Sequence, residues 1–98
     1  MYYYDAALTL LPEARELGPR PDVDGRIGVN FRYQGAIYSG YAVVGTRKIE
    51  PSSTTDLCLL ILKDDLRTGD VVDVLVANTK IGTAKIRARV EGDYRLAP

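Results

Sequence analysis

The chain has 98 residues, no histidine and one cysteine, and its 13 basic and 13 acidic side chains give a formal net charge of zero. Hydrophobic residues make up 46% and charged residues 27%, the composition of a single globular domain over residues 1–98. The lack of histidine removes the commonest general base and the commonest transition-metal ligand, and one cysteine cannot form a multi-cysteine zinc site. We therefore expect a non-enzymatic protein with no catalytic residue, no metal and no cofactor.

The apolar segments are too short for a membrane helix. The longest apolar run covers residues 57–62, whereas a spanning helix needs roughly 20 residues. The first five residues lack the basic and apolar pattern of a signal peptide, and the chain contains no glycine-rich phosphate-binding loop. These features predict a cytoplasmic protein with no membrane or nucleotide partner. Cys58 lies inside the apolar run and is expected to be a buried, structural thiol.

In chain order, the first predicted strand covers residues 2–11, where aromatic and apolar residues run up to Pro12. Residues 12–25 hold three prolines and two glycines, which predicts a long loop. Apolar and polar residues alternate along 27–33, and a turn at 34–35 leads into a third strand over 36–44. Gly40 in the middle of that strand suggests a bulge or a tight barrel corner.

The second half of the chain predicts three more strands. Residues 45–53 form a connection, and residues 54–62 form a strongly apolar fourth strand. The chain returns through residues 63–70 to a fifth strand over 71–77, and a turn at 78–80 leads to a sixth over 81–90. Short strands without a long amphipathic helix predict an all-β barrel or sandwich, and a closed barrel would remove exposed strand edges.

Several short motifs follow one another in an order seen in a known family. They are Ala7-Leu8-Thr9-Leu10-Leu11, Gly18-Pro19-Arg20, Phe31-Arg32-Tyr33, Ile49-Glu50-Pro51, Leu66-Arg67-Thr68-Gly69-Asp70 and Thr79-Lys80-Ile81-Gly82-Thr83-Ala84. Over about residues 5–90, this order resembles the C-terminal barrel, domain III, of elongation factor Tu. The resemblance implies a six-stranded antiparallel closed barrel of the translation-factor type, which in the family packs on a second barrel and helps hold aminoacyl-tRNA.

Individual residues match this family unevenly. Gly82 matches the glycine of the family's closing hairpin, and Arg20 matches its anion-facing position. The family's Gly-Tyr-Arg-Pro segment is represented by Gly25-Arg26-Ile27-Gly28, without the tyrosine and the proline. The resemblance therefore implies the barrel more strongly than it implies the binding of tRNA.

A basic stripe is predicted on the last strand. Strand alternation places Lys85, Arg87 and Arg89 on one face, and Lys80 at the hairpin tip extends the stripe. Such a stripe is suited to RNA phosphates or to an acidic protein surface. The alternative is a solvated barrel exterior whose charges pair across the hairpin, for example Lys85 with Asp73.

Two further groups are candidate binding residues. Arg15, Arg20 and Arg26 lie in or next to the predicted long loop, where interleaved acidic residues favour local ion pairs over a phosphate site. Tyr2, Tyr3 and Tyr4 cannot all face the core of one strand, so at least one of them is expected to lie at an interface or over a barrel end. Tyr38 is expected to share that surface, and homodimerisation through residues 2–4 is a further possibility.

These observations favour a non-catalytic binding module. Its expected partner is structured RNA of the translation apparatus or a translation-associated protein. The alternative is a protein-interaction device, such as an immunity or regulatory protein, that acts through its barrel surface. Salt dependence separates the two hypotheses, because phosphate contacts weaken steeply with salt while a tyrosine-centred interface does not.

Overall fold

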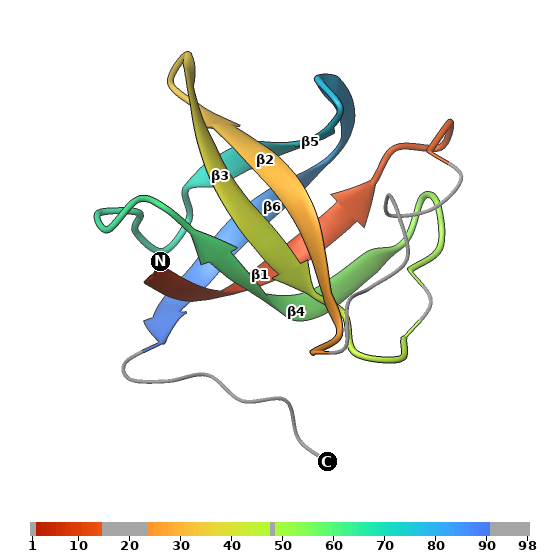
Figure 1. Ribbon diagram of the computed structural model, residues 1–98, viewed down its shortest axis with the longest axis horizontal. Coiled ribbons are helices and arrows are strands. Elements are labelled where there is room, and N and C mark those ends of the chain that lie inside the picture. Colours follow the sequence, from red (N-terminus) through yellow and green to blue (C-terminus); the bar gives the residue numbers. More distant parts are fainter. Residues whose placement is uncertain (1, 15–23, 48, 91–98) are drawn as a thin grey trace.

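The computed structural model describes residues 2–14, 24–47 and 49–90 and shows a closed β-barrel of six antiparallel strands, with no helix in those residues (Figure 1). The strands are β1 (Tyr2–Leu10), β2 (Arg26–Tyr33), β3 (Ala36–Val43), β4 (Thr54–Ile61), β5 (Val71–Val76) and β6 (Thr79–Val90). Their order around the barrel is β1-β4-β3-β2-β5-β6, and β6 pairs with β1 to close it. The predicted six-stranded antiparallel barrel is confirmed.

Every second residue of a strand points into the barrel, as the period of two predicts, and these side chains form the core. Along β1, for example, Tyr4, Ala6 and Leu8 are buried while Asp5 is exposed. The buried interior consists of Tyr4, Ala6, Leu8, Leu10, Ile27, Val29, Phe31, Ala42, Val44, Ile49, Leu57, Leu59, Ile61, Leu66, Val72, Val74, Ala84 and Ile86. Each fully buried large side chain of this kind stabilises a fold by about 1.5–3 kcal/mol relative to exposure.

Two inward-facing glycines allow neighbouring strands to approach closely. A Cβ atom at Gly40 would lie 1.9 Å from the carbonyl oxygen of Leu60 and 2.6 Å from the Phe31 ring. A Cβ atom at Gly82 would lie 2.4 Å from the carbonyl oxygen of Thr9. The β2–β3 ladder runs through Gly40 without a register shift, so this glycine serves a close contact and not a bulge.

The hairpin between β5 and β6 is tighter than predicted. Its turn consists of Ala77 and Asn78, both with positive φ (50° and 67°), as a two-residue turn of the type favoured in hairpins requires. The last strand therefore begins at Thr79 and not at residue 81. Lys80 consequently lies inside β6 opposite Leu75, and the prediction that it occupies the hairpin tip is wrong.

The strand ladders differ in length around the barrel. β3 pairs with β2 along its whole length, but it pairs with β4 only from Gly40 to Val43. β2 in turn pairs with β5 only over Asn30, Phe31 and Arg32. The tip of the β2–β3 hairpin therefore projects beyond its neighbours, at the top of Figure 1.

Candidate interaction surfaces

The predicted basic stripe on β6 is interrupted by a β-bulge. In the ladder with β1, Ala6 pairs with Ile86 and Asp5 pairs with Ala88, so that Arg87 is skipped. The bulge shifts the alternation, and Arg89 pairs with the inward-facing Tyr4. The prediction that Arg89 shares one face with Lys85 and Arg87 is therefore wrong, because one extra residue reverses the side on which later side chains lie.

Most cations of the predicted stripe have partners within the barrel. Lys80 forms an ion pair with Asp73 (3.2 Å), and Arg87 forms one with Asp56 (3.2 Å). Arg89 donates a hydrogen bond from Nη1 to the carbonyl oxygen of Asp64 (2.8 Å) and lies over the Tyr2 ring. Within the described ranges, no ion pair involves Lys85.

The alternative to a phosphate site was an ion pair between Lys85 and Asp73, and the structure does not contain this pair among the described residues. The Asp73 carboxylate binds Arg32 through Nε and Nη2 (3.1 and 3.0 Å) as well as Lys80, whereas Lys85 lies opposite Val71. The hydrogen bond from Arg32, followed by that from Lys80, lowers the pKa of the Asp73 carboxyl group. Charges do pair across strands, as expected, but the partners of Asp73 on β5 are Arg32 on β2 and Lys80 at the start of β6.

Of the loop arginines, Arg15 and Arg20 lie outside the described residues. Arg26 is the first residue of β2 and forms an ion pair with Asp24 (3.0 Å). Its guanidinium group also lies over the Tyr41 ring, with Cζ 5.0 Å from the ring centroid. Arg26 therefore contacts an aromatic residue on the outer face of the barrel.

The tyrosines at the N-terminus separate to different surfaces. Tyr4 has no exposed area and belongs to the core, so it is not an interface residue. Tyr2 is 36% exposed beneath the Arg89 guanidinium group, and Tyr3 lies on the outer face of the barrel. Tyr38 packs against the core from the barrel end and does not share a cluster with Tyr3.

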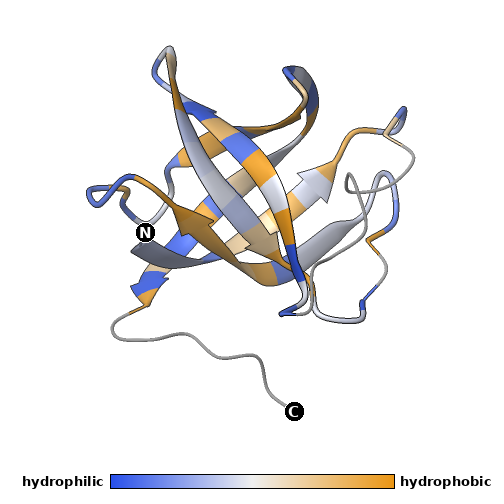
Figure 2. Cartoon of the chain, viewed as in Figure 1, coloured by the Kyte–Doolittle hydropathy of each residue, from blue (hydrophilic) through white to orange (hydrophobic). Residues whose placement is uncertain are grey.

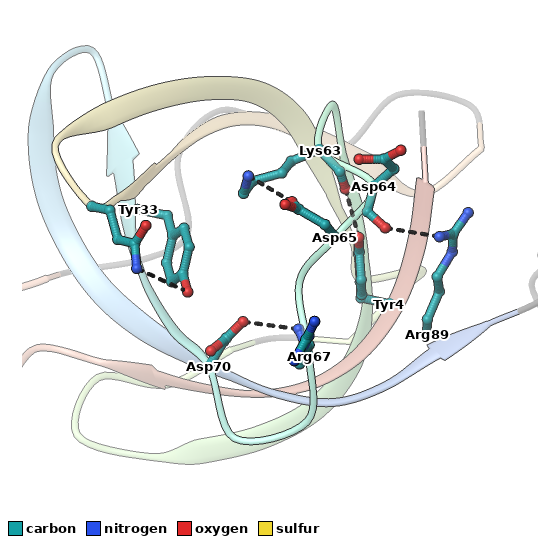
Figure 3. Close-up of polar contacts among 9 residues, drawn as sticks. Tyr4, Tyr33, Lys63, Asp64, Asp65, Arg67, Asp70 and Arg89 are labelled. Carbon is teal, nitrogen blue, oxygen red and sulfur yellow. Dashed lines mark hydrogen bonds and ion pairs between the residues drawn. The ribbon is translucent and has the colours of Figure 1, made fainter.

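A polar cluster at this barrel end was not predicted from the sequence. Lys63 lies over the rings of Tyr33 (5.7 Å) and Tyr38 (5.1 Å). It also forms an ion pair of 2.6 Å with Asp65 (Figure 3). The hydrogen bond between Lys63 and Asp65 raises the pKa of Lys63 and lowers the pKa of Asp65. Burial raises the pKa of Tyr33, and the nearby carboxylate of Asp70 raises it further. Local sequence gives no signal for this cluster, because its members come from β2, β3 and the loop after β4.

The second half of β4 is apolar on its outer face as well, which is unusual for a barrel exterior, whereas Thr54 and Asp56 in the first half are exposed and polar. Leu60 lies between Tyr3 of β1 and Tyr41 of β3 in the ladder registers, and Cys58 lies next to Val43. In Figure 2, β2 alternates between hydrophilic and hydrophobic residues, whereas the second half of β4 is hydrophobic throughout. We call Tyr3, Tyr41, Val43, Cys58 and Leu60 the outer apolar seam. Val43, Cys58 and Leu60 within it are at most 5% exposed.

Cys58 within the seam is a structural thiol. It is 1% exposed, and burial, together with the neighbouring Asp5 carboxylate, raises the pKa of the thiol to about 12. A thiol with so high a pKa is almost fully protonated near neutral pH and is a poor nucleophile. The predicted burial of Cys58 is confirmed.

A shallow groove of about 230 Å³ lies between β2, β3 and the end of β5 and shares Tyr41 with the seam. It is lined by Gly28, Val29, Asn30, Ser39, Gly40, Tyr41, Leu75, Val76 and Ala77. Tyr41 belongs to both the groove and the seam, so the two features are continuous. The lining carries hydroxyl and amide groups but no charged side chain, which makes it unsuited to phosphate.

The described part of the chain contains no group of three or more His, Cys, Asp and Glu side chains that could hold a metal ion. Residues 2–14, 24–47 and 49–90 also include no helix long and apolar enough to cross a membrane. Comparison of the sequence with protein-family models and with curated proteins found no match.

Proposed function

We propose that the chain is a non-catalytic protein-binding module that contacts its partner through Tyr3 and Tyr41, the partly exposed residues of the outer apolar seam, and through the adjoining groove. The observation that supports this proposal is that the second half of β4, from Leu57 to Ile61, is apolar on both faces. One face fills the barrel, and the other places Leu60 between two tyrosines on the exterior. A strand that faces solvent on one side normally alternates apolar and polar residues.

The composition of the seam fits a protein partner better than RNA. Tyrosines and aliphatic side chains are enriched in the cores of protein interfaces, and two tyrosines flank the seam. Arg26 over the Tyr41 ring adds a cation at the rim. The resemblance to the elongation factor Tu barrel makes a translation-associated protein the first class of partner to test, and an immunity or regulatory role is the alternative.

Binding to structured RNA is the weaker candidate. Three of the four stripe cations already bind a carboxylate or a backbone carbonyl group, and the Arg89 side chain does not lie on the same face as Lys85 and Arg87. RNA phosphates would have to compete with these contacts. Lys85 and Arg87 are exposed on β6, but Arg87 is paired with Asp56, so Lys85 is the stripe cation without an ion pair to the described residues.

The test is a capture experiment with the immobilised barrel and cytoplasmic lysate, at low and at high salt, with bound proteins and bound RNA identified separately. Tyr41→Ser removes an aromatic side chain of the seam, and Val71→Ser is the matched control because Val71 is a 54% exposed residue on β5. A third variant replaces Lys85, Arg87 and Arg89 by alanine.

The proposal predicts a specific protein that stays bound to the wild-type barrel at high salt. The same protein should bind Val71→Ser and the triple variant equally well, and Tyr41→Ser at least about tenfold more weakly. Enriched RNA that is lost at high salt and in the triple variant, without a seam-dependent protein, would overturn it in favour of RNA binding.

A further inference from the structure

Three side chains at the barrel end converge on one ammonium group. The Lys63 Nζ atom lies 5.7 Å from the centroid of the Tyr33 ring and 5.1 Å from that of the Tyr38 ring. It also lies 2.6 Å from the Asp65 carboxylate. Both ring distances fall within the roughly 6 Å over which a cation is attracted to an aromatic face. Aromatic rings and a carboxylate are the groups with which proteins bind alkylammonium ligands.

The barrel holds both rings in place independently of Lys63. Tyr33 ends β2 and Tyr38 lies in β3, so the β2–β3 ladder fixes their backbones, and both side chains pack against the core. The carboxylate of Asp70 lies beside Tyr33 and accepts a hydrogen bond from the backbone N–H of Arg67 (2.8 Å; Figure 3). Two rings and two carboxylates therefore surround the position of the cation. We call Tyr33, Tyr38, Asp65 and Asp70 the ammonium site.

The Lys63 side chain is held less firmly than the Lys63 backbone. Its carbonyl oxygen accepts a hydrogen bond from the buried Tyr4 hydroxyl, which fixes the backbone to the barrel. The ammonium group is held by the ring contacts and by Asp65, whose own side chain is 70% exposed. Exposed contacts of these two kinds together change an equilibrium constant by roughly tenfold. The side chain can therefore leave the ammonium site while the loop stays in place.

We propose that the ammonium site binds the alkylammonium group of an external ligand, and that Lys63 occupies the site until this ligand displaces it. A methylated ammonium group is the better occupant, because its methyl groups weaken its hydration and contact the ring faces directly. The primary ammonium group of Lys63 has three N–H donors, which ring faces satisfy poorly.

Two kinds of molecule carry such a group. One is the side chain of a methylated lysine in a protein, and the other is a free quaternary ammonium compound such as choline. The chemistry that the site recognises is the same in both. This inference goes beyond the proposed function, because it uses the barrel end and not the outer apolar seam or the groove.

Titration of the protein followed by two-dimensional amide NMR tests the proposal, because backbone amide signals report where a small ligand binds. The probes are choline and dimethylbutanol, its uncharged isostere. Tyr38→Leu removes one ring of the site, and Tyr41→Leu is the matched control, since Tyr41 lies on the outer face with Arg26 over its ring. Lys63→Ala removes the internal occupant, and Lys63→Gln removes its charge while keeping most of its length. Far-UV circular dichroism verifies that each variant folds.

Choline should shift the amide signals of Tyr33, Tyr38 and Lys63 saturably in the wild type. It should bind both Lys63 variants at least about tenfold more tightly, because the competing cation is gone. Tyr41→Leu should bind choline like the wild type, whereas Tyr38→Leu should lose binding. Equal binding of dimethylbutanol, the absence of saturable shifts in the wild type, or unchanged affinity in a folded Lys63 variant would overturn the proposal.

A peptide with one trimethylated lysine, beside the same peptide with unmodified lysine, identifies the source of the ligand. Tighter binding of the trimethylated peptide than of choline assigns the site to a protein ligand, and the reverse order assigns it to a free quaternary ammonium compound. Equal binding of the two peptides would contradict recognition of a methylated group. Tyr38→Leu leaves Tyr3 and Tyr41 of the seam in place, so ammonium binding and seam-dependent capture fail separately.

Discussion

The hydroxyl group of Tyr4 donates a hydrogen bond of 2.5 Å to the carbonyl oxygen of Lys63, which lies 59 positions later in the chain. Tyr4 is a core residue of β1, and Lys63 follows the end of β4. The bond satisfies a buried phenol and, at the same time, directs the chain after β4 across the barrel end. The polar cluster around Lys63 depends on this turn.

Replacement of Tyr4 by phenylalanine should destabilise the barrel by about 1 kcal/mol, because it removes one hydrogen bond and leaves the Lys63 carbonyl without its donor. Urea unfolding measures the effect. Tyr2→Phe is the matched control, since Tyr2 lies two residues earlier at the surface and should change stability little. Equal stability of the Tyr4→Phe variant and the wild type would show that the bond contributes nothing.

Gly40→Ala should destabilise the fold by about 1–3 kcal/mol or more, because the added methyl group would meet the backbone of β4 at a distance that requires movement. Gly28→Ala, on the outer face of β2, is the control. Its Cβ atom would lie 4.0 Å from the Tyr41 ring, an ordinary contact. Thermal unfolding of the two variants should therefore differ clearly, and a similar melting temperature would contradict the close approach of β3 and β4.

The raised pKa of the Cys58 thiol predicts a loss of stability at high pH. The folded protein keeps the thiol protonated to about pH 12, while the unfolded chain releases the proton near the ordinary value of 9.0. Stability contributed by this group is complete below the unfolded pKa and falls as pH rises above it, by up to about 1.4 kcal/mol per pH unit. Cys58→Ala should show a smaller decrease in urea unfolding above that pH. Identical pH profiles would exclude the effect.

Alkylation offers an independent measurement of the same thiol. Iodoacetamide should modify native Cys58 far more slowly than the unfolded chain at the same pH, because both burial and protonation protect it. The control is labelling in urea, where the thiol is exposed. Equal rates in the native and unfolded states would contradict the buried position on β4.

The lowered pKa of Asp73 predicts a loss of stability in acid. Its carboxylate accepts hydrogen bonds from Arg32 and Lys80, which favour the ionised form. The contribution is present above the ordinary pKa of 3.8 and is lost as pH falls through the lower folded value. At neutral pH the free energy of unfolding of the wild type should exceed that of Asp73→Asn by roughly 1 kcal/mol or less, because the pair is partly exposed. The difference should vanish in acid. Asp24→Asn, at another surface ion pair, is the comparison.

Much of the fold could be predicted from the sequence because its signals are local. Alternating residues along 27–33 and 71–77 predicted strands that the structure contains, the second of them ending one residue earlier at Val76, and Pro12 follows the end of β1. The start of β6 was misplaced because positive φ at Ala77 and Asn78 makes a two-residue turn without the Asn-Gly pair that usually marks one.

The arrangement of the candidate interaction surfaces was harder to predict from the sequence. Strand alternation placed Arg89 on the basic stripe, but the bulge at Arg87 arises from pairing with β1, about 80 residues away, and no local pattern marks it. The Lys63 cluster and the seam between Tyr3, Leu60 and Tyr41 likewise combine residues from separate strands.

The sequence by itself determined the composition of the core, the all-β architecture and the lack of histidine chemistry, because period-two hydrophobicity and residue inventory are properties of the chain. Only the tertiary structure decided which charges are already paired and which tyrosine is buried. Those outcomes depend on ladder register and length, and register is set when strands distant in sequence pair and bury one face.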